Sequence, residues 1–161
     1  MFNLITAVLS IMLVASIAAA TVSYIQPSAI LAQGVRMETI NHLKAFQGAS
    51  SRYMEDHVNE VGQTVLPAPG TNMLAELSPA YMFSPPAPAG YQWSSSTGVY
   101  QGAYNGIWVC LQPTDVNEIS VKGISSAIKQ FSPAAVFTSN ACGASANGAG
   151  SAFTLWVLAG H

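Results

Sequence analysis

The residues of this sequence best suited to acid–base chemistry are consecutive: Glu55, Asp56 and His57. A histidine beside carboxylates can transfer protons in general acid–base catalysis. The three residues fall, however, in a stretch with the period of an amphipathic helix, where such a cluster is typical of a solvent-facing polar side. We therefore interpret them as surface residues.

The other chemical motifs make no better case for an enzyme. Residues 143–148 resemble a serine-nucleophile motif, but no strand leads into them and no His–Asp pair accompanies them, so we interpret them as a flexible loop. The sequence contains no Gly-rich dinucleotide motif and no phosphate-binding loop. Asp115 and Glu118 do not form an identifiable carboxylate pair for glycoside hydrolysis. The sequence predicts neither an enzyme nor a cofactor.

Several aromatic side chains of the C-terminal part offer a different possibility, a surface on which a ligand could stack. They are Tyr91, Trp93, Tyr100, Tyr104, Trp108 and Trp156. Aromatic residues also fill the cores of small sheets, where they bury large apolar areas. We favour the core interpretation for most of them.

Charged side chains are scarce in this chain. Its 161 residues include five Lys+Arg and seven Asp+Glu, or 7%, against about 25% in ordinary soluble domains. Half of the residues are hydrophobic, which argues against a typical cytosolic enzyme and against a charge-rich disordered chain. The net charge of −2 provides no basic surface for nucleic acid. The charges are also uneven: residues 1–35 have none, whereas residues 36–60 have seven.

The uncharged start contains an apolar segment, residues 4–25. As a helix it would be roughly 33 Å long, enough to cross a bilayer core of about 30 Å. It could be a membrane anchor, or a helix that is first held in a membrane and later packs against copies of itself. A cleaved signal peptide ending near Ala18-Ala19-Ala20 is the weakest interpretation, because no Lys or Arg precedes Leu4.

The apolar segment is predicted to continue into an amphipathic half. Pro27 would kink the helix without ending it. Beyond it, apolar residues recur at spacings of three and four: Met37, Ile40, Leu43, Phe46, Tyr53 or Met54, Val58 and Val61. The sequence thus predicts one long helix of some 55 residues within a region 1–60, apolar over 1–35 and amphipathic over 36–60.

Residues 61–161 are predicted to form a globular head. Six of the nine prolines lie in residues 62–90, which we expect to be a connecting loop with a short helix at 72–77 capped by Asn72. Strands are predicted at 91–94, 99–104, 107–111, 134–138 and 152–158, with Asn105-Gly106 as a hairpin turn. A helix is predicted at 115–131. The fold class is α+β: a long N-terminal helix, lollipop-like, packed on a small antiparallel sheet.

The two cysteines of the head, Cys110 and Cys142, are either buried thiols or a disulfide. If the apolar segment enters a membrane, the head lies in an oxidising compartment, where such pairs are usually bridged. We therefore predict a disulfide. The histidines, His42, His57 and His161, are not at ligand spacing with the cysteines, so no metal site is predicted.

The layout of the whole chain resembles a type IV pilin, and the helix between the cysteines looks more like the type IVb and conjugative-pilus branch. The resemblance rests on the start Phe2-Asn3-Leu4-Ile5, the apolar segment, Pro27, the amphipathic continuation and the paired cysteines. Two features depart from the family pattern. Thr6 or Ile5 stands where pilins usually carry a glutamate, and no short basic leader precedes Met1, which we expect to be the mature, methylated N-terminus.

The resemblance implies a structural subunit of a surface filament (fimbrium) used in adhesion, conjugation or related tasks. The inner membrane would hold the subunit, a prepilin peptidase would process it, and an assembly ATPase platform would move it into a helical homopolymer outside the cell. The residues that the resemblance places in the membrane and then in the filament core are Phe2, Leu4, Ile5, Val8, Leu9, Ile11, Leu13, Val14, Ile17, Val22 and Ile25.

Other functions stay open at this point. A minor or tip pilin and a pseudopilin of a secretion system share the same architecture. A membrane-anchored module that binds a ligand through its aromatic sheet belongs to another class, and a secreted enzyme with an uncleaved signal is the last alternative. Filaments under the electron microscope would separate the pilin from the last two.

Overall fold

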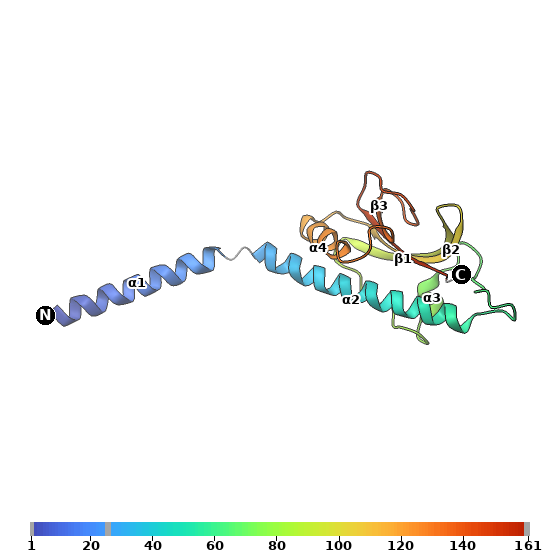
Figure 1. Ribbon diagram of the computed structural model, residues 1–161. Helices are drawn as coiled ribbons and strands as arrows, with labels where there is room; N and C mark the ends of the chain where they lie inside the picture. The colour runs from blue at the N-terminus through green and yellow to red at the C-terminus, as the bar shows by residue number, and fades with distance from the viewer. Residues whose placement is uncertain (1, 25–26, 160–161) are drawn as a thin grey trace.

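The computed structural model describes residues 2–24 and 27–159, and within the first helix it describes the side chains of residues 4–17. The fold is α+β, as predicted, with a four-stranded antiparallel sheet. The elements along the chain are α1 (Phe2–Tyr24), α2 (Pro27–Asp56), α3 (Met73–Leu77), β1 (Tyr91–Tyr100), β2 (Tyr104–Pro113), α4 (Glu118–Ile128), β3 (Val136–Ser139) and β4 (Ala152–Leu158). Figure 1 shows α1 lying apart from the head, which α2 to β4 form.

The sheet has the strand order β1-β2-β4-β3, and each neighbouring pair is antiparallel. Its register places Ile107 beside Val157, and Val109 beside Leu155. Because side chains alternate along a strand, these residues share one face of the sheet. They belong to the same buried cluster as Phe46 of α2, so this face packs against α2.

The buried side of α2 follows the predicted apolar stripe from Ile40 to Met54, but Met37, predicted as its first residue, is 51% exposed. Ile40, Leu43, Phe46, Tyr53 and Met54 are all buried, and they recur at the three- and four-residue spacing of a helix face. The same helix exposes most of its charged residues, but Arg36 is only partly exposed and its Nε is buried. The stripe fixes α2 across the sheet.

The small helix α4 lies against α2 at a place where the two backbones approach closely. A Cβ atom at Gly123 would stand 2.7 Å from the carbonyl oxygen of Ala32 and 2.8 Å from Cβ of Val35. Glycine is therefore required for this contact. Ile124, the next residue, is fully buried and packs in a second core cluster with Leu111 of β2.

The continuity of the predicted single helix of some 55 residues depends on residues 25 and 26. The described residues form two helices, and Pro27 is the first residue of α2. This position suits proline, because the first residue of a helix has no helical partner for an N–H. Residues 25 and 26 lie outside the described part of the chain.

The amphipathic helix also ends earlier in the chain than the sequence predicts. Helix α2 ends at Asp56, so Val58 and Val61 do not extend its buried stripe. Both are exposed, Val61 to 82%. A turn built on Asn59 replaces the helix here, since its side-chain oxygen accepts hydrogen bonds from the backbone N–H groups of Val61 (3.0 Å) and Gln63 (2.8 Å).

The β1–β2 turn does not lie at Asn105-Gly106, where the sequence analysis places it. The turn residues are Gln101 and Gly102, which both have positive φ (48° and 72°). Gly106 instead lies inside β2, paired with Gly98 of β1. A Cβ atom at Gly106 would stand 2.8 Å from the carbonyl oxygen of Val157, so the glycine serves close strand packing and not a turn.

The remaining elements match the predictions with small shifts. Helix α3 is capped by Asn72, whose side chain accepts from Leu74 N at 3.1 Å, and β4 has the predicted bounds. Helix α4 is shorter at both ends than the predicted 115–131, since Asn117 caps its start and Lys129 is its C-cap. The strands predicted at 91–94 and 99–104 are joined into β1 through residues 95–98, and the predicted end at 101–104 falls instead in the turn and the first residue of β2.

Candidate assembly surface

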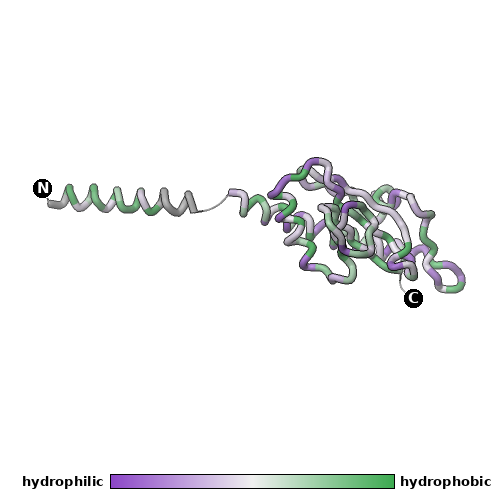
Figure 2. The backbone as a smooth tube through the Cα atoms, turned by 90° about the horizontal axis from the view of Figure 1, so that it is seen from above, coloured by the Kyte–Doolittle hydropathy of each residue, from purple (hydrophilic) through white to green (hydrophobic). Residues whose placement is uncertain are grey.

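Helix α1 exposes apolar side chains in every direction around its axis. Four consecutive residues, Ile11, Met12, Leu13 and Val14, are exposed to 68%, 66%, 64% and 66%. Successive residues of an α-helix point about 100° apart, so these four cover the full circle. Figure 2 shows hydrophobic residues along α1. A helix that is apolar on all sides is normally buried in a core or bundle.

Two hydroxyl groups of α1 lie in this apolar surface without adding unpaired donors to it. Ser10 donates to the carbonyl oxygen of Thr6 at 2.8 Å, and Ser16 donates to that of Leu13 at 2.9 Å. Each hydroxyl hydrogen is therefore satisfied within the helix. A neighbouring apolar helix could cover these serines without leaving their donors unpaired.

The apolar surface extends into the first turns of α2. Ile30 and Leu31 are 59% and 58% exposed, and the first buried residue of α2 is Thr39. Helix α4 begins to cover α2 near Ala32 and Val35. We use the name assembly surface for the exposed apolar residues of α1 together with Ile30 and Leu31.

Most of the predicted filament-core residues lie on this surface. Leu4, Ile5, Val8, Leu9, Ile11, Leu13, Val14 and Ile17 are exposed. Phe2 and Val22 lie in α1, but their side chains fall outside the described part, as do Met1 and Ile25 altogether. Over residues 2–24 and 27–159, no helix has both the length and the apolar character needed to cross a membrane, so the predicted membrane-spanning segment finds no support there.

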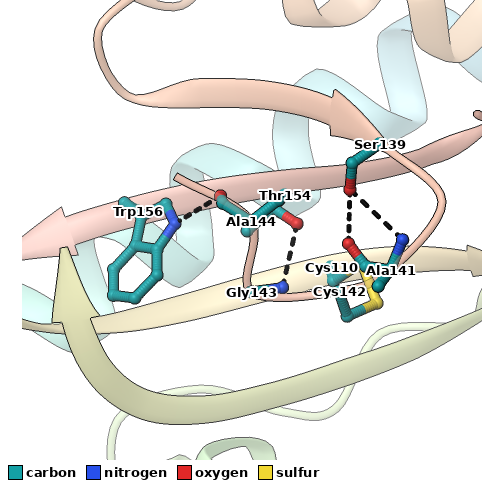
Figure 3. Close-up of a disulfide and its surroundings, with 8 residues drawn as sticks. All are labelled: Cys110, Ser139, Ala141, Cys142, Gly143, Ala144, Thr154 and Trp156. Carbon is teal, nitrogen blue, oxygen red and sulfur yellow. Dashed lines mark hydrogen bonds between the residues drawn. A yellow bond between two sulfur atoms is a disulfide. The ribbon is translucent and has the colours of Figure 1, made fainter. Parts of the chain in front are cut away.

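The predicted disulfide is present. Cys110 of β2 and Cys142 are joined, with their Cα atoms 5.5 Å apart. Figure 3 shows the bridge holding the loop before β4 onto the sheet face that is turned away from α2. Two further hydrogen bonds fix the loop: Gly143 N donates to the hydroxyl of Thr154 at 3.2 Å, and the indole N–H of Trp156 donates to Ala144 O at 2.8 Å.

Removing this disulfide should lower the free energy of unfolding by about 3–4 kcal/mol, because the unfolded chain gains the freedom of a loop of 32 residues. Urea unfolding of a Cys110→Ala, Cys142→Ala variant measures the change. Wild-type protein unfolded in a reducing agent is the control and should lose a similar amount. A loss below about 1 kcal/mol in both would contradict this role.

Most of the aromatic residues belong to the core, which is the interpretation favoured over a ligand-stacking surface. Tyr100, Phe137 and Trp156 form a buried cluster on the same face as the disulfide, with Trp108 packed against it. Tyr104 differs, because it is 41% exposed. The sequence did not predict this exposure. It placed the hairpin turn at Asn105-Gly106, whereas Tyr104 is the first residue of β2.

The structure places two of the acid–base candidates, Asp56 and His57, in contact with tyrosines. The His57 ring stacks on Tyr53 with centroids 4.0 Å apart, and its Nδ1 lies 2.8 Å from Tyr53 O. Asp56 accepts a hydrogen bond from the Tyr81 hydroxyl at 2.8 Å. Within the described residues, no group of three His, Cys, Asp or Glu side chains could hold a metal ion.

These contacts predict a loss of stability at alkaline pH. The hydrogen bond to Asp56 raises the pKa of Tyr81, and burial raises the pKa of Tyr53 and of Tyr91 above the ordinary 10.0. The folded state therefore favours the neutral phenols. Their contribution is complete below pH 10.0 and is lost as the pH rises through the higher folded-state values.

Urea unfolding at a series of pH values from about 9 to 11.5 tests this expectation. The free energy of unfolding should fall more steeply in wild type than in a Tyr53→Phe variant, which lacks one of the three groups. Equal slopes for the two proteins would show that Tyr53 contributes nothing to the pH dependence.

Comparison with protein-family models, with curated proteins and with solved structures finds no match to this chain.

Proposed function

We propose that this protein is the structural subunit of an extracellular filament of the type IV pilus kind, and that it polymerises through the assembly surface. The observation that carries the proposal is α1, which is apolar all round and exposed along residues 4–17. Apolar surface of this extent in water is strongly unfavourable, and its burial contributes about 25 cal/mol per Å². The helix therefore requires covering by other apolar surface.

Copies of α1 are the partners that suit this helix best. A single flat partner would cover one side of α1 and leave the others exposed, whereas a bundle of equivalent helices covers every side. The Ser10 and Ser16 hydroxyls are satisfied within the helix, so they can enter such a bundle at low cost. Small residues such as Ala7 and Ala15 would let neighbouring helices approach closely.

The arrangement of the head also favours an open polymer. Figure 1 shows the sheet beside α2, with α1 clear of it. Copies can therefore bring their α1 helices together while their heads stay outside the bundle. A contact between different surfaces of successive copies generates a helical filament when the rotation between copies does not close into a ring.

The proposed location is the cell exterior, where the Cys110–Cys142 disulfide would persist. A prepilin peptidase and an assembly ATPase platform are the proposed partners in making the filament. The inner-membrane stage of the subunit stays a prediction from the sequence.

Negative-stain electron microscopy of the purified full chain tests the proposal. We expect thin filaments from the full chain and none from a matched protein that begins at Pro27. Intact-mass analysis of the same preparation would report N-terminal methylation. A full-length chain that still contains α1 and remains monomeric without detergent would refute assembly through this helix.

A further inference from the structure

Phe83 is an aromatic residue that the head exposes almost completely, to 81%. It lies in the segment between α3 and β1, where Tyr81 and Met82 pack against the main core cluster and Phe83 does not belong to it. Figure 1 shows part of this segment on the side of α2 away from β3. Single apolar residues are common on protein surfaces, so the exposure of Phe83 by itself indicates no function.

The segment is, however, held in place on both sides of Phe83. Before it, the Tyr81 hydroxyl donates a hydrogen bond to Asp56 at 2.8 Å. After it, the indole N–H of Trp93 donates to the carbonyl oxygen of Pro86 at 3.0 Å. Proline fixes its own φ and further restricts the backbone between these two anchors. An aromatic ring presented by such a segment loses little entropy when a partner covers it.

A hollow of about 350 Å³ lies beside β3. Its apolar walls come from the end of α4, the turn after it and β3, namely Ile128, Phe131, Pro133 and Val136. Val136 is 8% exposed, and Ile128 and Phe131 pack against the main core cluster, so these walls are part of the folded head. An apolar cavity of about 150 Å³ already accommodates benzene, so a phenylalanine ring fits by size. We call this site the β3 hollow.

The β3 hollow is formed in the single chain and carries one cation. Thr138, which also lines it, is fixed at its N–H by the Asn147 side-chain oxygen (3.0 Å) and at its carbonyl oxygen by Gly148 N (2.8 Å). Lys129 lines the hollow, is exposed, and forms no ion pair within residues 27–159. An ammonium group is attracted to the face of an aromatic ring. Apolar walls with one cation therefore suit an aromatic side chain.

Phe83 and the β3 hollow belong to opposite edges of the sheet. The strand order places β1 at one edge and β3 at the other, and four strands spaced by about 4.8 Å put these edges about 14 Å apart. The Trp93–Pro86 hydrogen bond ties the segment of Phe83 to β1, whereas β3 lines the hollow. Two rigid heads can therefore make the contact in one direction only, which leaves one ring and one hollow for further copies.

We propose that Phe83 of one copy inserts into the β3 hollow of the next copy, as a contact between heads in the polymer. The inference rests on the proposed assembly through α1, to which it adds a second contact. The ring exchanges water for the apolar walls, and Lys129 supplies the cation for its π face. A ring and a hollow on different surfaces form a heterologous contact, which continues from copy to copy when the rotation does not close into a ring of subunits.

Photo-crosslinking of the assembled full chain tests the contact directly. A chain with p-benzoylphenylalanine in place of Phe83 is mixed with isotope-labelled wild-type chain, assembled and irradiated, and mass spectrometry then locates the crosslinks. We expect crosslinks between the two kinds of chain that fall within residues 128–138. Crosslinks that fall only elsewhere, or only within one chain, would overturn the proposal.

The critical concentration for assembly, measured by sedimentation, gives the weight of the contact. Phe83→Ala should raise this concentration about tenfold, because the ring no longer buries apolar area. Lys129→Ala should raise it about threefold, because it removes the cation and leaves the apolar walls. Both positions are exposed, so the urea midpoint of the head should stay that of wild type.

Two matched variants serve as controls. Phe83→Tyr keeps the ring, and Val61→Ala removes an apolar side chain that is equally exposed, at 82%, in another part of the head. Both should assemble at the wild-type concentration. If wild type assembles and Phe83→Ala assembles equally well, the contact between heads is refuted and assembly through α1 stands. If wild type forms no filaments, the proposed function fails, and the contact between heads fails with it.

Discussion

A lysine in place of Val14 should abolish filament formation. Val14 is 66% exposed in the single chain and lies in the middle of the apolar part of α1, where a bundle would bury it. An ammonium group buried there without a partner costs several kcal/mol, and every copy in the filament would carry that cost. Negative-stain microscopy and sedimentation of the Val14→Lys protein measure the yield of polymer.

The control for this experiment adds the same charge where the helix already faces solvent. Gln47 is exposed on α2, outside the assembly surface, and Gln47→Lys should assemble normally. Both variants should keep the free energy of unfolding of the head, because neither position contributes to its core. Wild-type amounts of filament from Val14→Lys would show that α1 does not pack in the way proposed.

Truncation of Phe46 to alanine should have the largest effect on stability. Phe46 is 1% exposed and lies in the main core cluster between α2 and the sheet, with Ile107, Val109 and Leu155. Loss of the ring removes buried apolar area and leaves a cavity, which together cost about 3–5 kcal/mol. Chemical unfolding followed by circular dichroism measures the change.

Phe83 provides the matched comparison for Phe46. It is the same residue type but is 81% exposed, so Phe83→Ala should change the free energy of unfolding by less than about 0.5 kcal/mol. Similar effects of the two substitutions would mean that the packing between α2 and the sheet does not hold the head together.

The elements that sequence reasoning predicted correctly are those with a strong local signal. The apolar spacing of Leu43 and Phe46 indicates the buried face of α2, and Asn72 provides a clear N-cap for α3. The disulfide between Cys110 and Cys142 was predictable because the chain offers only that pair. In the first two cases residues close together in the sequence determine the structure. In the third, only one pairing of cysteines is possible.

The errors arise where distant parts of the chain decide the local structure. Asn105-Gly106 and Gln101-Gly102 are both plausible turns, but the close approach of Val157 to Gly106 is a contact between strands that the local sequence does not reveal. The serines of β1 are similar. They favour turns on their own, yet Ser95 accepts a hydrogen bond from Leu74 N at 2.7 Å, which ties the strand to α3.

The assembly surface was predictable, since an uncharged apolar run is visible in the sequence itself.

If the chain polymerises as proposed, the separation of α1 from the head has a consequence for the order of events. The core clusters of the head draw on α2, α3, α4 and the sheet, and none of the described side chains of α1, residues 4–17, belongs to them. The head can therefore finish folding, and close its disulfide, before any other copy arrives. Each subunit would then reach the growing polymer as a complete unit, with only its docking to other copies left to accomplish.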